Sequence, residues 1–183
     1  MKKSIIVWMI LVAVVLVWSC NRSQEPSEGN KFRSENKIVQ QEDGTISLKL
    51  DNAQCYSDKS NPSSNTAEWN VVVSKSGRYN VWLSSATTDT TDLHYNNSVM
   101  LNILDHRIEA HPECDKVVRN SSEVSYPYFR ADSFMGSLYL QDTGLYNIQV
   151  ISEKIVPDDY KPDESSKAEN SKLISVLITP TTR

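Results

Sequence analysis

The chain has three histidines, the residues whose imidazole rings could bind a metal or transfer a proton. Two of them, His106 and His111, lie five residues apart. Zinc-protease helices hold two histidines at a closer spacing, with a glutamate between them that activates water. Here the spacing is one residue too long for that motif, and the intervening sequence is typical of a strand. Positions five apart in a strand point to opposite faces. We therefore predict no metal site at these histidines.

Other catalytic patterns are missing from the sequence. It contains no G-x-S-x-G nucleophile turn, and its five glycines form no phosphate-binding loop. The neighbouring acids Asp158 and Asp159 lie in a polar stretch, where nothing apolar would raise a carboxyl pKa for acid catalysis. We expect a protein that is not an enzyme and has no cofactor. A structural calcium is left open, with Asp43, Asp51 and Asp89 as loose candidates and no ligand set assigned.

The charge balance excludes one further class. The chain has 183 residues, with 19 Lys and Arg against 23 Asp and Glu, and a formal net charge of -4. Nucleic-acid-binding proteins usually present a basic surface, because phosphate neutralisation supplies much of their affinity. We expect no nucleic-acid partner.

The elements that must position any site are short strands. Apolar residues alternate with polar ones, and turn residues separate the alternating segments. The segments are 45–51, 69–74, 79–83, 99–103, 138–140, 146–150 and 174–178. A period of two without amphipathic helices predicts an all-β, antiparallel β-sandwich. The polar stretches 57–67, 86–97 and 154–172 are predicted to be loops.

The N-terminus is predicted to be a targeting signal. Lys2 and Lys3 precede an apolar run from Ile5 to Trp18, which is short for a membrane span and fits a signal peptide. The end of this run, Val17-Trp18-Ser19-Cys20, resembles a bacterial lipobox, although Trp18 is bulkier than usual. The resemblance implies lipidation of Cys20. The alternatives are an ordinary signal peptide or an N-terminal anchor, with Cys20 incidental.

The predicted organisation is a signal peptide at 1–19, a lipidated Cys20 with a flexible tether over 20–37, and a single β-sandwich domain at 38–183. Acyl chains on one cysteine give stable anchoring. We expect the protein at the bacterial outer membrane, on its periplasmic face or the cell surface.

Two other cysteines, Cys55 and Cys114, belong to the predicted domain. A pair of cysteines in an exported protein suggests a disulfide, and two separate buried thiols are the alternative. No CxxC occurs, so neither a zinc ribbon nor a thioredoxin-type site is indicated.

A weak internal repeat connects two of the strands. Gly77-Arg78-Tyr79-Asn80-Val81 matches Gly144-Leu145-Tyr146-Asn147-Ile148. In each copy we expect glycine to form the turn, and tyrosine to bury its ring and bind the preceding turn through its hydroxyl. Two such hairpins favour a pseudo-symmetric sandwich.

The stretch from Ala67 to Leu83, with a Trp69 strand followed by the Gly77-Arg78-Tyr79 turn, resembles the core of carbohydrate-binding modules of families 6 and 35. The segments 138–148 and 173–180 occupy the places of the closing strands. The resemblance spans roughly 45–180 and implies a jelly-roll, galactose-binding-like sandwich of the kind appended to fucosidases and other glycoside hydrolases. It also implies a ligand cleft among loops at one edge and, in many members, a structural calcium.

Loop chemistry selects the candidate ligand residues. Aromatic faces stack on sugar C–H patches, and amides and charged groups bind the hydroxyls. The candidates are His94, Tyr95, Asn96 and Asn97 in one segment, and Tyr126, Tyr128, Phe129 and Arg130, beside Asp132, in another. Each aromatic could instead cover the core. Trp69 is predicted to be a core residue, whereas Trp82 either packs on a second buried face or forms an exposed platform.

These observations predict a lipid-anchored, non-catalytic domain that binds polysaccharide near partner enzymes, such as glycoside hydrolases, or transporters. The alternatives are a protein-interaction or structural lipoprotein on the same fold and, third, a small glycoside hydrolase.

Overall fold

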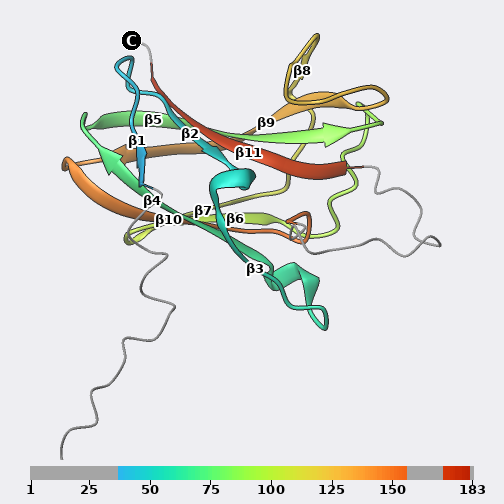
Figure 1. Ribbon diagram of the computed structural model, residues 1–183, viewed down its shortest axis with the longest axis horizontal. Coiled ribbons are helices and arrows are strands. Elements are labelled where there is room, and N and C mark those ends of the chain that lie inside the picture. The colour runs from blue at the N-terminus through green and yellow to red at the C-terminus, as the bar shows by residue number, and fades with distance from the viewer. Residues whose placement is uncertain (1–36, 156–170, 182–183) are drawn as a thin grey trace, which may run out of the picture. The chain divides into compact units, whose positions relative to one another are not determined.

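The computed structural model describes residues 37–155 and 171–181, which form two β-sheets packed face to face (Figure 1). Sheet A has the order β1 (Lys37–Val39), β4 (Thr66–Val73), β10 (Gly144–Ile151), β6 (Val99–Ile103) and β7 (His106–Ala110), and β3 (Gln54–Tyr56) also pairs with β4. Sheet B has the order β2 (Ile46–Lys49), β11 (Ser171–Pro180), β5 (Gly77–Thr87), β9 (Phe129–Leu140) and β8 (Lys116–Val118). The predicted antiparallel sandwich is confirmed, except that β1 runs parallel to β4. Two short 3-10 turns, η3 (Leu50–Asn52) and η4 (Pro62–Ser64), complete the described elements.

The predicted domain boundary at residue 38 falls beside the start of β1 at Lys37. The expected signal peptide, Cys20 and all of the tether before Lys37 lie outside the described residues. In the two described ranges, no helix is long and apolar enough to cross a membrane.

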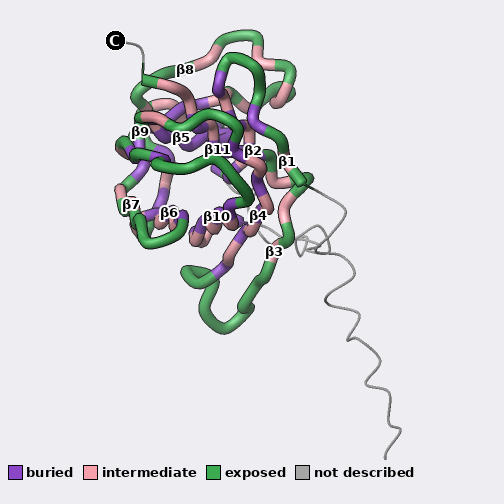
Figure 2. Tube along the Cα trace, turned by 90° about the vertical axis from the view of Figure 1, so that its left-hand side faces the viewer, coloured by how far each residue is buried: buried purple, intermediate pink, exposed green. Residues whose placement is uncertain are grey.

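The core lies between the sheets, and the alternation in the sequence decides which side chains enter it (Figure 2). Along β4, every second residue is buried, from Ala67 to Val73. Trp69 is 2% exposed, and its indole Nε1 donates a hydrogen bond to the Lys49 carbonyl over 2.9 Å. The prediction that Trp69 is a core residue is confirmed.

The two repeat copies lie in opposite sheets, on β5 and β10. Tyr79 donates a hydrogen bond to the Lys75 carbonyl over 2.6 Å, and Tyr146 donates to the Asp142 carbonyl over 2.7 Å. Both rings are buried, and each hydroxyl reaches four residues back. The predicted role of these tyrosines is confirmed.

Two strands depart from a simple alternation. In β11, a register shift lies between Leu173 and Ser175. As a result Leu173, and not the predicted Ile174, is buried in the core together with Val176. Strand β9 is far longer than the predicted 138–140 and begins at Phe129, with a shift opposite Val81 and Trp82. Both irregularities hide strand residues from a search for strict period two.

The structure forms no disulfide between Cys55 and Cys114, which corrects the sequence-based expectation. Cys55 lies on β3 of sheet A, whereas Cys114 lies in the connection from β7 to β8, near Asp132 of sheet B. A disulfide needs Cα atoms within about 7 Å of each other. Burial, with the nearby charges of Asp115 and Asp132, raises the pKa of the Cys114 thiol.

Candidate functional site: an aromatic platform on sheet B

The first predicted ligand segment follows β5 and is folded against the body of the domain. Tyr95 is only 5% exposed, belongs to the core, and shares a 2.8 Å hydrogen bond with the Ser85 hydroxyl. Its ring faces are therefore closed to a sugar, which overturns its predicted role. The His94 ring lies between two carboxylates, with Nδ1 3.2 Å from Asp92 and Nε2 3.6 Å from Asp89.

The Asn96 backbone and the Asn97 side-chain amide are also engaged. The Asn96 backbone N–H and the Asn97 side-chain amide both donate to the carboxylate of Glu153, which follows β10. These contacts hold the loop to the neighbouring sheet. Polar groups already used in this way are poorly placed to bind a ligand.

Arg130, from the second predicted segment, is the centre of an ion network. Its Nε and Nη2 donate to Asp132 over 2.8 and 3.3 Å, and its Nη1 donates to Glu123 over 2.6 Å. Ser84 adds a 2.8 Å hydrogen bond to Asp132, and Lys49 lies 3.6 Å from Glu123. Burial opposes the Arg130 charge, but the two carboxylates outweigh it and raise the pKa of the guanidinium. Arg130 therefore acts as a structural cation, contrary to its predicted role.

The aromatic residues of this segment differ in accessibility. Tyr126 is 93% exposed and Phe129 is 46% exposed, so both rings are open. Tyr128 is partly buried, and the Lys172 Nζ lies 5.9 Å from the centre of its ring. Because Thr87 pairs with Phe129, the two predicted segments leave the same end of sheet B. They share a location, but the burial of Tyr95 prevents them from forming one aromatic cleft.

The ion network divides the outer face of sheet B into two halves. In the half near Thr87 and Phe129, the Glu123 carboxylate forms ion pairs with both Lys49 of β2 and Arg130 of β9. It therefore lies over β11 and β5, the two strands between them. Ser84 and Ala86 point outward there and are buried. Toward the start of β5, the face is open.

The open half forms an aromatic platform, built from three cross-strand pairs of β5 and β9. Its residues are Arg78 with Tyr139, Asn80 with Ser137, and Trp82 with Phe134. The Trp82 and Phe134 rings lie 5.2 Å apart at 57°. Phe134 is 45% exposed and Tyr139 is 51% exposed. Four residues of strand separate Trp82 from Arg78, which gives the platform a length of roughly 13 Å.

The sequence indicated only part of this platform. The position of Trp82, out of phase with its buried neighbours, left two alternatives, a second buried face or an exposed platform. The structure places Trp82 between them: it is partly buried, on the outer face of sheet B beside Phe134. Phe134 and Tyr139 were not predicted, because the register shift in β9 interrupts the alternation that would have placed them on one face. Only the pairing of β5 with β9 brings these aromatics together.

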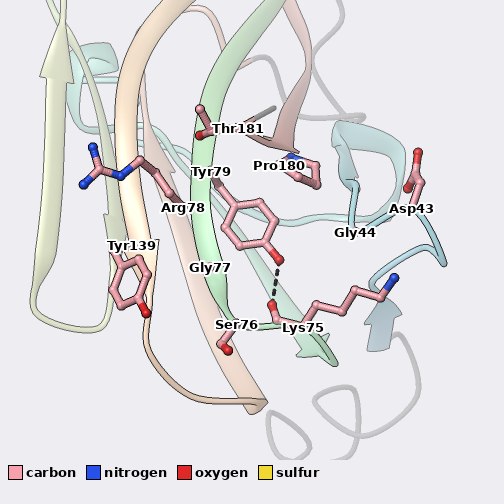
Figure 3. Close-up of a pocket in the computed structure, with 10 residues that line it drawn as sticks. All are labelled: Asp43, Gly44, Lys75, Ser76, Gly77, Arg78, Tyr79, Tyr139, Pro180 and Thr181. Atoms are coloured by element: carbon pink, nitrogen blue, oxygen red, sulfur yellow. Dashed lines mark hydrogen bonds between the residues drawn. The ribbon is translucent and has the colours of Figure 1, made fainter. Parts of the chain in front are cut away.

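A hollow of about 700 Å³ continues from the platform around the end of the sandwich (Figure 3). Arg78 and Tyr139 belong to both surfaces. The opposite wall comes from the turn at Asp43 and Gly44 and from Pro180 at the end of β11. The hollow lies at the end of sheet B opposite the predicted ligand segments.

The loose calcium candidates do not meet in one place. The Asp43 carboxylate accepts hydrogen bonds from the N–H and hydroxyl of Thr45, and Asp89 accepts from the N–H and hydroxyl of Thr91. Asp51 belongs to the turn η3. Among residues 37–155 and 171–181, no three His, Cys, Asp or Glu side chains are grouped as a metal site.

No protein-family model matches the sequence, and no curated protein matches it either. Among solved structures, the fold is similar to part of an alpha-L-fucosidase from Vibrio sp. strain EJY3, with 19% identity and a TM-score of 0.61. That match covers 80% of this chain and 24% of the fucosidase, so this chain spans about a quarter of that protein.

Two carbohydrate-binding modules (CBMs) are also structural neighbours. The CBM35 from Cellvibrio japonicus Abf62 matches 75% of this chain and 94% of its own, with 12% identity and a TM-score of 0.40. The CBM36-1 domain of a multidomain xylanase from the hindgut metagenome of Trinervitermes trinervoides matches 76% and 99%, with 11% identity and a TM-score of 0.40. The likeness to the fucosidase segment supports the fold of the described domain, which is a two-sheet β-sandwich.

Proposed function

We propose that this domain binds glycan on the aromatic platform of sheet B and does not itself cleave it. The observation that carries the proposal is the Trp82–Phe134 pair, followed along the same face by the half-exposed Tyr139. Large aromatic faces on a regular strand surface suit the C–H faces of sugar rings. The fold alone does not assign this function, since related sandwiches serve many roles.

Polar groups between the rings suit the hydroxyls of a sugar. The Ser137 hydroxyl donates to the Asn80 amide oxygen over 2.7 Å, which fixes the amide between the two aromatic positions. A platform of roughly 13 Å is longer than one sugar ring, so it fits a chain of sugars better than a monosaccharide.

The composition of the platform supports the proposed non-catalytic role. Glycosidases generally need two carboxyl groups flanking the scissile bond. None of the six platform residues is an acid. We propose further that the domain is held at the outer membrane through a lipid on Cys20, where it would retain polysaccharide near enzymes or transporters.

Binding should be measured with the full chain in detergent, first on a glycan array and then by titration of each glycan that binds. We expect Trp82→Ala, Phe134→Ala and Tyr139→Ala each to weaken binding about tenfold or more, because truncating an aromatic anchor of an interface costs roughly 1.4 kcal/mol or more. Tyr56→Ala is the matched control, since Tyr56 is 49% exposed on β3 of the other sheet.

Two results would redirect the proposal. Loss of binding with Tyr126→Ala, but not with the platform variants, would return the site to the loops predicted from sequence. Absence of binding to every glycan would favour the protein-interaction alternative, because aromatic and arginine side chains are also typical of protein interfaces.

A further inference from the structure

The outer face of sheet A carries an apolar strip at one end, on the opposite side of the sandwich from the aromatic platform. Val39 of β1 pairs with Val72 of β4, and Val72 pairs in turn with Leu145 of β10. Each of the three is adjacent in its strand to a residue that packs in the core, so it points to the outer face. Leu104, in the turn between β6 and β7, extends the strip beyond β10. These four residues form a continuous apolar strip across the end of the sheet.

Most of the strip is open to solvent. Val39 is 63% exposed, Leu145 is 58% exposed and Leu104 is 67% exposed, whereas Val72 is partly buried between its neighbours. Farther along the same face, amide and acid side chains bond to one another across β4 and β10. Single exposed apolar residues are ordinary, but a contiguous set with a polar border marks an interaction surface.

Two features favour a lipid surface as the partner of this strip. Cys20 and Lys37 are 17 positions apart, and a flexible chain of that length has a root-mean-square span of roughly 23 Å. With Cys20 lipidated, as proposed above, β1 begins within that reach of the bilayer, only two residues before Val39. The strip is also small, because four side chains bury far less than the roughly 800 Å² per partner of a stable protein interface. A few apolar side chains suffice as the second membrane signal of a protein that is already anchored.

We infer that the apolar strip docks the anchored domain on the bilayer, with its side chains at the boundary between headgroups and acyl chains. The inference rests on the proposed lipid at Cys20 and adds the orientation of the domain. Figure 1 shows sheets A and B as separate layers, so their outer faces point in opposite directions. Docking through sheet A therefore turns the platform of sheet B away from the membrane, where a polysaccharide can reach it. The exposed Lys37 and Asp105 beside the strip have opposite charges, so docking should depend little on salt.

The test is hydroxyl-radical labelling of the full chain in vesicles of phosphatidylethanolamine and phosphatidylglycerol, with the oxidation rate of Leu145 measured by mass spectrometry. Val39→Thr and Leu104→Gln should each speed the oxidation of Leu145 about fourfold or more, because each buried CH₂ group that is lost shifts the docking equilibrium by about that factor. Val117→Thr is the matched control for Val39→Thr, since Val117 is an exposed valine on β8 of sheet B. The oxidation rate of Phe134, on the platform, should be the same in all four proteins.

The outcomes separate docking from the proposed function, because vesicle flotation tests the anchor and glycan titration tests the platform. A chain that does not float with the vesicles would contradict the anchor and the docking together. Flotation with Leu145 oxidised equally fast in the parent and both variants would overturn docking and leave the anchor and the glycan site intact. Protection of Leu145 that disappears when the protein is diluted in the bilayer would assign the strip to a second copy of the chain and overturn the lipid assignment. Protection of Phe134 in place of Leu145 would reverse the orientation and overturn the inference.

Discussion

The ion network around Arg130 offers the clearest separation between a structural and a ligand-binding residue. Replacing Arg130 with methionine keeps most of the side-chain volume and removes the charge. Three hydrogen bonds are lost, two to Asp132 and one to Glu123. The Asp132 side chain is 10% exposed, so water cannot readily replace the guanidinium there, whereas the Glu123 side chain is 22% exposed and can partly rehydrate.

The magnitude follows from the carboxylate that is left behind. Breaking a buried ion pair by removing one partner costs about 3–5 kcal/mol. We take the lower end, about 3 kcal/mol, because Ser84 still donates to Asp132 after the substitution. For a domain of this size, this corresponds to a fall in melting temperature of roughly 10 °C. Glu123→Gln keeps an acceptor for Arg130 and should cost only about 1 kcal/mol.

The assay is urea unfolding of the full chain in detergent, followed by tryptophan fluorescence, with glycan binding measured on the folded protein. Asp132→Asn, alone and combined with Arg130→Met, completes a double-mutant cycle in which the combined loss should be well below the sum of the single losses. A loss of less than about 1 kcal/mol in the unfolding free energy of Arg130→Met would refute the structural role, because leaving a buried acid without its partner costs more than that. Unchanged stability with weakened glycan binding would instead restore Arg130 as a ligand residue.

Three further predictions concern the fold around the hollow and the remaining thiol chemistry. Tyr79→Phe should lower the free energy of unfolding by about 2 kcal/mol, and Tyr146→Phe by about 1 kcal/mol. The difference arises because the Tyr79 hydroxyl also accepts a hydrogen bond from the buried Gln40 amide. Equal losses for the two variants in urea unfolding would contradict this. Gly44→Ala should lower the free energy of unfolding by about 2–4 kcal/mol, since the Gly44 φ is +89° and a new Cβ would lie 2.8 Å from Pro180. A loss of stability below about 1 kcal/mol, measured by thermal melting, would argue against this close packing. Cys114 should be alkylated more slowly in the folded chain than in urea near pH 8.5, because its raised pKa keeps the thiol protonated in the folded state. The difference should shrink at higher pH. Mass spectrometry of the Cys114 peptide measures both rates, and equal rates would contradict the prediction.

Alternation in the sequence was sufficient to predict the sandwich, because a strand that buries one face must place apolar residues at every second position. The same reasoning identified Trp69 as core and assigned the hydroxyls of Tyr79 and Tyr146 to their own turns. These features depend on local chain geometry, which is set by residues close together in the sequence.

The ligand residues were harder to predict, because accessibility depends on what else packs against a side chain. Tyr95 lies in a polar segment that folds inward. Arg130 is occupied by Asp132 on its own strand and by Glu123 in the preceding loop, and the sequence does not show that the loop folds back onto the strand. The Cys55–Cys114 pairing failed for a related reason, since the fold places Cys55 on a strand of sheet A and Cys114 in the connection to sheet B.

The sequence by itself determined seven of the strand segments, most of their buried faces and the class of fold. Only the tertiary structure decided that Trp82 lies beside Phe134, and that Arg78 and Tyr139 lie beside each other and line one hollow with residues of other turns. Cross-strand register brings these residues together, and a single shift in β9 changes which side chains are partners. Register and strand order are set by the packing of the whole domain, so the candidate site emerged only after the sheets were assembled.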